Sequence, residues 1–209
     1  MMVTSQGTVK RIPFIALKTN RKGGIRALTL DENDHLINVI RTNGNDNIIL
    51  ATENGMAICF NENDVRPMGR DAAGVKGITL TEGDRVIGAE KFEEGKTLLT
   101  VTVNGFGKRT ELTEYLRTGP EGEKMPQQRG GKGLKNYTIT PKTGKIAGCR
   151  VVSESDDVML IENGGVIIRI PAASINVYKR DVQGVIVMRI DEGNELVSIE
   201  RVEAMEEQQ

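Results

Sequence analysis

Two glycine-containing segments recur four times along this chain of 209 residues, and the repeat constrains the fold more than any other feature. The first segment places a turn between short apolar stretches, with its glycine at Gly7, Gly55, Gly105 and Gly164. The second begins with a glycine and continues with alternating apolar residues, at Gly24, Gly74, Gly133 and Gly184. A period of about 50 residues is typical of propeller-like arrays, in which small sheets stack because none can bury its faces alone.

Each repeat is predicted to contain four short strands. Three of the four turns read Asn-Gly between alternating apolar residues, which predicts a β-hairpin with a type I′ turn. The second segment predicts a third strand, and an apolar stretch after a polar turn predicts the fourth, at 36–40, 86–89, 146–152 and 196–202. We therefore expect an all-β array of about four four-stranded antiparallel blades in one domain over 1–202. The repeats are placed at about 1–47, 48–97, 98–156 and 157–202, with an acidic tail at 203–209.

The third repeat carries an insertion. Its two glycines, Gly105 and Gly133, are 28 positions apart, against 17, 19 and 20 positions in the other repeats. The additional residues, 118–126, are polar and turn-forming, so they predict an extended surface loop. This loop leads directly into a glycine-rich box, Gln127-Gln128-Arg129-Gly130-Gly131-Lys132-Gly133.

The chemistry of the box suits phosphate. Its glycines allow backbone N–H groups to approach an anion, Arg129 offers a planar guanidinium, and Lys132 offers a mobile charge. A plain flexible turn is the alternative. The box does not match a nucleotide P-loop, because no Gly-Lys-Ser/Thr follows a glycine at the required spacing.

Other basic residues recur at equivalent places in the repeats, which predicts a curved cationic track around the rim that follows the phosphates of duplex DNA. Each of them taken singly also fits a solvated surface charge. The candidate DNA-binding residues outside the box are Lys10, Arg11, Arg21, Lys22, Arg26, Arg66, Arg70, Lys76, Lys108, Arg109, Arg117, Lys135, Arg169, Lys179 and Arg180, with Lys124 beside Arg117.

Composition limits the alternatives. The net charge of −1 gives no support by itself to nucleic-acid binding, so the distribution of charge has to decide. With 3% aromatic residues there is no platform for stacking single strands, and no recognition helix is apparent, so binding is expected to tolerate any duplex sequence. No apolar run is long enough to cross a membrane and no signal peptide is recognised, so we expect a soluble intracellular protein.

No catalytic or metal-binding group is predicted. Cys59 and Cys149 each lie in an apolar stretch and are expected to be buried reduced thiols. The single histidine, His35, follows a polar turn and fits a surface position. Tyr115, Tyr137 and Tyr178 fit repeat core or loop positions better than a nucleophile that cleaves DNA.

These residues resemble a known family. The box differs only at Gln128 from the heptapeptide that marks the C-terminal domain of gyrase A, and residues 66–78, 104–110 and 181–185 resemble that domain as well. The resemblance covers essentially the whole chain. It implies a β-pinwheel, a disc of blades related to a propeller in which neighbouring repeats exchange strands. It also implies that this chain corresponds to the last four blades of a six-bladed domain, with its box as a second copy.

The resemblance further implies that the chain binds and wraps duplex DNA and so supports negative supercoiling. The chain would not be an enzyme on its own but part of an ATP-dependent type II topoisomerase. It would use no cofactor itself, with ATP and Mg²⁺ used by the rest of the enzyme. The implied partners are duplex DNA, the remainder of gyrase A and the gyrase B subunit, with no membrane and no small-molecule substrate. The implied location is the cytoplasm, in association with the nucleoid.

Two alternatives remain at this point. The first is the equivalent C-terminal domain of topoisomerase IV, which is also a pinwheel but has a degenerate or absent box; the nearly intact box favours gyrase. The second is a bladed protein-interaction scaffold whose basic residues only keep it soluble. The sequence leaves open whether the repeats close into a disc, the handedness of a DNA wrap and the oligomeric state.

Overall fold

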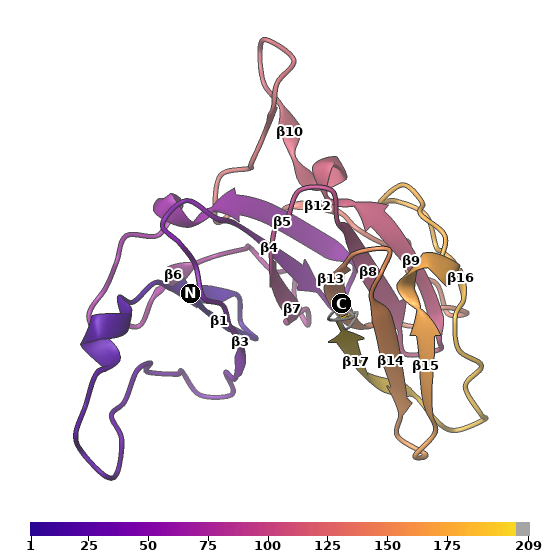
Figure 1. Cartoon of the computed structure of the whole chain (residues 1–209), viewed down its shortest axis with the longest axis horizontal. Coiled ribbons are helices and arrows are strands. Elements are labelled where there is room, and N and C mark those ends of the chain that lie inside the picture. The colour runs from indigo at the N-terminus through magenta and orange to yellow at the C-terminus, as the bar shows by residue number, and fades with distance from the viewer. Residues whose placement is uncertain (204–209) are drawn as a thin grey trace, which may run out of the picture.

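The computed structural model describes residues 1–203, which form four small antiparallel sheets arranged side by side along an arch (Figure 1). The all-β fold of four blades is confirmed: the described residues contain strands and four short 3-10 helices, with no α-helix. No helix among them is long and apolar enough to cross a membrane. Residues 204–209, most of the expected acidic tail, lie outside the described residues.

Each blade is built from the hairpin and last strand of its own repeat. Blade 1 contains β1 (Met2–Thr4), β2 (Thr8–Lys10) and β3 (Leu36–Val39). Blade 2 contains β4 (Asn47–Thr52), β5 (Met56–Asn61) and β7 (Val86–Lys91). Blade 3 contains β8 (Thr97–Thr102), β9 (Phe106–Glu111) and β13 (Ile146–Val152). Blade 4 contains β14 (Asp157–Glu162), β15 (Ile167–Pro171) and β17 (Leu196–Val202).

The fourth strand of a blade comes from the next repeat. We call these the donor strands: β6 (Val75–Lys76), β12 (Leu134–Lys135) and β16 (Val185–Ile186). They pair with β2, β5 and β9 respectively, so each donor strand completes the blade before its own. The strand exchange implied by the family resemblance is confirmed. The donor strands span two residues each, shorter than the alternating pattern predicted.

The hairpin turns differ from the predicted type. In each turn the glycine N–H donates to the carbonyl three residues earlier, as from Gly55 to Thr52 at 3.1 Å and from Gly105 to Thr102 at 2.9 Å. Only the glycine has positive φ, whereas Asn54 and Asn104 do not. This is a type I turn closed by a glycine bulge, so the type I′ prediction was wrong. In the fourth repeat the glycine with positive φ is Gly165, one residue after the predicted Gly164.

Short 3-10 helices follow the hairpins, and in the third and fourth repeats their buried residues pack in the core shared with the preceding blade. They are η1 (Phe14–Leu17), η2 (Glu62–Asp64), η3 (Leu112–Tyr115) and η4 (Ala172–Ser174). Tyr115 of η3 is buried with Cys59 and Cys149 in the core between blades 2 and 3. The cores therefore lie between blades, and both cysteines are free buried thiols, as predicted.

The last strands of the repeats lie next to one another: β3 contacts β7, β7 contacts β13, and β13 contacts β17. The donor strands lie at the opposite edge of each sheet, because the strand order runs from last strand to donor strand. The donor strands and the loops that lead to them therefore form the outer edge of the arch (Figure 1). The insertion of the third repeat projects from this edge as an arm, with strands β10 (Arg117–Thr118) and β11 (Lys124–Met125).

In the described part of the chain, blades 1 to 3 have the predicted four strands, whereas blade 4 does not, and the first repeat lacks one of the four strands predicted for each repeat. Blade 4 has three strands, because within residues 1–203 no donor strand pairs with β15. The first repeat contains the corresponding glycine, Gly24, but its residues 25–30 form no strand among the described residues.

Candidate nucleic-acid interface

The glycine-rich box is the third-repeat form of a connection that recurs along the chain. After η2, η3 and η4 the chain runs alongside the hairpin of the preceding blade, where Pro67, Gln127 and Val177 form equivalent parallel bridges with Arg11, Phe60 and Arg109. It then reaches the donor strand. We call residues 66–76, 117–135 and 176–186, together with the equivalent 18–28 of the first repeat, the crossover segments.

Two predicted DNA contacts are buried lysines. The ammonium of Lys10 donates to Ala27 O at 2.9 Å and Arg70 O at 2.6 Å, and that of Lys108 donates to Lys179 O at 2.7 Å and Arg180 O at 2.6 Å. Both residues are 0% exposed. Burial lowers the pKa of Lys108 to about 7. We therefore correct the prediction that they contact phosphate, because both hold a crossover segment from inside the blade.

Three arginines of the hairpin strands have carboxylate partners. Arg109 is buried, donates to Ile175 O at 2.7 Å and pairs with Glu154 at 3.2 Å, so its predicted DNA contact is also corrected. Arg11 is half-buried and pairs with Glu62 at 3.2 Å. Arg169 is exposed but pairs with Asp157 at 2.7 Å.

The guanidinium of Arg129 holds the box against the preceding repeat by hydrogen bonds. It donates to Asp64 O at 3.1 Å and to Lys76 O, which lies on donor strand β6. Arg180 makes the equivalent contact one repeat later, to Lys135 O at 3.0 Å on donor strand β12. The fork that was predicted to hold phosphate is therefore engaged by backbone carbonyls.

The glycines of the box are also used partly for packing. Gly130 has positive φ, its N–H donates to Gly77 O at 2.8 Å, and its carbonyl accepts from the Thr79 hydroxyl at 2.7 Å. Gly131 O accepts from Thr79 N at 2.8 Å. A side chain on Gly133 would meet the carbonyl oxygen of Ala57. Gln127 is held as well, through Cys59 O at 2.7 Å and Tyr115 O at 3.0 Å.

An open pocket of about 580 Å³ lies between the box, the arm and the next crossover segment. Four cations line it, from three different stretches of chain: Arg117, Lys124, Lys132 and Arg180. Glu114 is the only carboxylate among the lining residues. Lys132 is exposed, and none of the hydrogen bonds or ion pairs found among residues 1–203 involves its ammonium. This is where the box presents charge to solvent.

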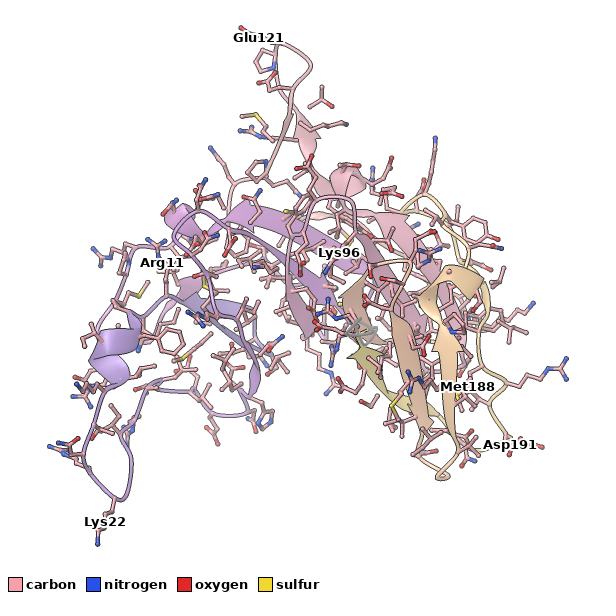
Figure 2. All side chains as sticks on the ribbon, in the orientation of Figure 1. Arg11, Lys22, Lys96, Glu121, Met188 and Asp191 are labelled. Atoms are coloured by element: carbon pink, nitrogen blue, oxygen red, sulfur yellow. The ribbon has the colours of Figure 1, made fainter. Side chains whose placement is uncertain are left out.

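The remaining predicted cations lie on the crossover segments and are exposed or, for Arg70, half-buried: Arg21, Lys22, Arg26, Arg66, Lys76, Lys135 and Lys179 are the exposed ones. Figure 2 shows Lys22 at the tip of the first segment, pointing away from the protein, and Glu121 at the tip of the arm. The prediction overlooked Lys18, which is exposed on the same segment; its position in the repeat was the available signal.

The net charge of −1 for the whole chain conceals an excess of basic residues on these segments. The four crossover segments contain fourteen of the 28 Lys and Arg residues and only four of the 29 Asp and Glu residues. Among residues 1–203, none of the ion pairs includes a cation of these segments. Three crossover segments, 66–76, 117–135 and 176–186, end in donor strands that pair at the outer edge of the arch (Figure 1). Their cations therefore form a basic surface that follows the curve of this edge.

A strand-exchanged array of blades with a basic outer edge defines the class: a propeller-like repeat domain of the pinwheel type. Comparison with known proteins specifies it further. The chain belongs to the family described as the DNA gyrase C-terminal domain, beta-propeller, whose model matches residues 1–43, 46–93, 96–121, 126–153 and 156–203. The residues left unmatched between the third and fourth stretches, 122–125, lie in the arm.

Curated relatives agree. The chain is 39% identical over 204 residues to the DNA gyrase A protein of Staphylococcus epidermidis and 41% identical over 202 residues to that of Clostridium acetobutylicum, with 97% of this chain covered in both. It spans 22% and 23% of those relatives, about a fifth of their length.

Two solved structures share the fold. The C-terminal domain of DNA topoisomerase IV superposes with a TM-score of 0.88 at 27% identity, covering 97% of this chain and 61% of that one. The DNA gyrase A C-terminal domain gives 0.80 at 26% identity, covering 96% and 64%. These identities do not separate the two enzymes, whereas the family match and the curated relatives confirm the predicted resemblance to gyrase.

Proposed function

We propose that the chain binds duplex DNA along the crossover segments and bends it around the outer edge of the arch. The observation that carries this proposal is the charge distribution. The crossover segments contain half of the Lys and Arg residues of the chain but only four of its 29 Asp and Glu residues. A cation without a carboxylate partner is free to replace the counterions of phosphate, which is the main source of sequence-independent affinity for DNA. A curved cationic surface favours a bent duplex, because bending brings more phosphates into contact.

The proposed contacts exclude the cations that the fold uses. Arg66, Lys76, Lys132, Lys135 and Lys179 are exposed, and among the described residues their side chains make no hydrogen bond or ion pair. They come from three successive crossover segments, so one duplex can reach them in series. Lys10, Lys108 and Arg109 are excluded because they are buried.

Fluorescence anisotropy with a labelled duplex tests the proposal. If six to ten phosphates are neutralised, affinity falls roughly 10³- to 10⁵-fold between 50 and 200 mM salt. Replacing Arg66, Lys132 and Lys179 together by Gln removes three contacts, so the slope of log K against log[salt] decreases by about 3. Unrelated duplex sequences should bind alike, since phosphate contacts carry no sequence information.

The matched control replaces three cations outside the crossover segments, Lys91, Lys142 and Arg189, by Gln. The change in net charge is the same, so a mechanism that depends only on overall charge would weaken both variants equally. An unchanged salt slope in the crossover variant, with the fold intact by circular dichroism, would overturn the proposal and favour a protein-interaction scaffold.

In the longer protein that the relatives represent, we propose that this bending presents DNA to the rest of a gyrase and supports negative supercoiling. The proposed partners are nucleoid DNA in the cytoplasm, the remainder of gyrase A and the gyrase B subunit, with ATP and Mg²⁺ used outside this chain. Relaxed circular DNA closed by ligase in the presence of the chain should show a shifted linking number. The variant Arg129→Ala, Lys132→Ala should reduce this shift without abolishing binding, and complete loss of binding would make the box the main anchor.

A further inference from the structure

The arm is an addition to the repeat, and its charges are sorted along its length. The crossover segments before and after it are shorter and still reach their donor strands, so the blade fold does not require the arm. The cations Arg117 and Lys124 lie on its two short strands and line the pocket beside the box. The carboxylates Glu121 and Glu123 lie toward the tip and do not line that pocket (Figure 2). The arm therefore places positive charge at the pocket and negative charge away from it.

Hydrogen bonds within the arm fix its two cations. The Nε of Arg117 donates to Pro126 O at 3.2 Å, and the ammonium of Lys124 donates to the hydroxyl of Thr118, its partner across the two strands, at 3.2 Å. Among residues 1–203, the two terminal nitrogens of Arg117 have no acceptor. The arm thus holds a guanidinium in place while its outer N–H groups stay available to an anion.

The box contributes backbone N–H groups to the same pocket. Gly131, Lys132 and Gly133 line it, and no acceptor for their three consecutive N–H groups is found in the part of the chain that the structure describes. The N–H of Gly130, in contrast, is used for packing. Successive backbone N–H groups without acceptors suit an anion, so one half of the box is free for this role.

Arg180 completes the pocket from the next crossover segment. One nitrogen of its guanidinium donates to Lys135 O at 3.0 Å, and the other two have no acceptor within residues 1–203. Among the lining residues, four cations face the single carboxylate of Glu114. Three stretches of chain therefore bring N–H donors and positive charge to one place, which a single negatively charged group would satisfy.

We propose that this pocket holds one phosphodiester group of a DNA duplex, bound jointly by the arm, the box and Arg180. The inference rests on the proposed function, because it needs a duplex that follows the outer edge. It goes further in making the arm a DNA-contacting element and the third crossover segment the most strongly held point of the duplex. The carboxylates of the tip lie beyond the pocket, so they favour a duplex that runs beside the arm over one that crosses it.

A double-mutant cycle tests whether the arm and the box act on the same phosphate. The arm variant is Arg117→Gln, Lys124→Gln and the box variant is Lys132→Ala, with duplex affinity measured by fluorescence anisotropy at low salt. Each variant should weaken binding about tenfold, since charge-assisted hydrogen bonds to a phosphate are lost. The combined variant should also lose about tenfold, because residues that share one partner are coupled. A loss of about a hundredfold, the product for independent contacts, would overturn the inference and leave the proposed function intact.

Two controls accompany the cycle. Arg66→Gln, Lys76→Gln removes the same charge from the second crossover segment, outside the pocket, so its effect should multiply with that of Lys132→Ala. Glu121→Gln, at the tip of the arm, should change affinity by less than about twofold. If the arm, box and second-segment variants all bind the duplex as tightly as the unmodified chain, both the inference and the proposed function fail.

Amide NMR spectra distinguish a duplex from a free anion. The signals of Gly131, Lys132 and Gly133 should shift when a short duplex is added in equimolar amount, and should shift much less in the arm variant. Inorganic phosphate at the same concentration should leave them in place, because it lacks the other contacts along the outer edge. Saturation of these signals by inorganic phosphate, with no further change when duplex is added, would show that the pocket takes a free anion and would overturn the inference.

Discussion

The crossover segments of the third and fourth repeats reach equivalent donor strands but are held by different residues. In the fourth, the buried ammonium of Lys108 binds the carbonyls of Lys179 and Arg180 from the acceptor hairpin. In the third, the equivalent hairpin residue is Ile58, and the crossover supplies its own cation, Arg129, together with backbone bonds between the box and Gly77 and Thr79. In the third repeat, Arg129 and the glycine backbone of the box therefore hold the crossover segment, in place of a lysine buried in the acceptor blade.

This difference shows why a glycine-rich basic motif can be interpreted in two ways. The glycines of the box permit the close approach that a phosphate would need, but here much of that approach is to the preceding crossover segment. One cation of the box, Arg129, is engaged in seating it, and the other, Lys132, faces solvent. Changing the seating residues should alter stability, whereas changing the exposed residue should alter only DNA binding.

The largest effect is expected for Lys108→Met. The substitution leaves two carbonyls of a crossover segment without their donor inside the blade, so the free energy of unfolding should fall by about 3 kcal/mol. Urea unfolding followed by circular dichroism measures it. The matched control is Ile58→Met at the equivalent position of blade 2, which conserves volume and should cost less than about 1.5 kcal/mol. Equal losses would mean that the lysine acts only by filling space.

A smaller loss is expected for Arg129→Ala. It removes the guanidinium bonds to Asp64 O and Lys76 O but keeps the backbone bonds of the box, so about 1.5 kcal/mol of unfolding free energy should be lost. Arg180→Ala removes the equivalent bond to Lys135 O while Lys108 still holds that segment, so it should cost less than Arg129→Ala. The opposite order in urea melts would show that the box is seated by its backbone alone.

Much of this fold follows from the repeat, because a period of glycines at turns and strand starts fixes where the chain can reverse. The last strands were predicted within two residues for this reason. The strand exchange came from the family resemblance, since pairing with the preceding hairpin leaves no mark on the local pattern of a two-residue strand. The turn type was wrong because Asn-Gly also suits a type I turn with a glycine bulge, in which only the glycine needs positive φ.

The outer cationic surface was predicted in outline, but the sequence could not sort exposed cations from buried ones. Lys10 and Lys108 occupy strand positions where an aliphatic residue stands in blades 2 and 4, and that alternation was the signal for burial. What makes burial tolerable is a pair of carbonyls for each ammonium. Those of Lys108 lie 71 and 72 residues away, and those of Lys10 lie 17 and 60 residues away, which no local pattern reveals. The same limit applies to Arg129, whose acceptors lie 53 and 65 residues earlier.

The pH dependence of stability should distinguish the lysine-held segment from the box. Because burial lowers the pKa of Lys108 from 10.5 to about 7, the folded state releases a proton between these values while the unfolded state keeps it. Stability from this group therefore rises as pH increases through that window and is lost as pH falls toward 7. The destabilisation by Lys108→Met should be larger at pH 8 than at pH 7, by about 1 kcal/mol. A constant difference across this range would show that the two carbonyls keep the ammonium charged.

The smallest effect on stability is expected for Lys132→Ala, which removes the solvent-facing cation of the box. Since its ammonium has no partner among residues 1–203, the free energy of unfolding should change by less than about 0.5 kcal/mol. If the pocket beside the arm holds a phosphate, the salt slope of DNA binding should fall by about 0.9, one contact. Arg189→Ala, at an exposed cation outside the crossover segments, should change neither quantity, because among the described residues its side chain makes no hydrogen bond or ion pair. An unaltered slope for Lys132→Ala would leave the box as a structural clasp between repeats, with DNA bound by the other crossover cations.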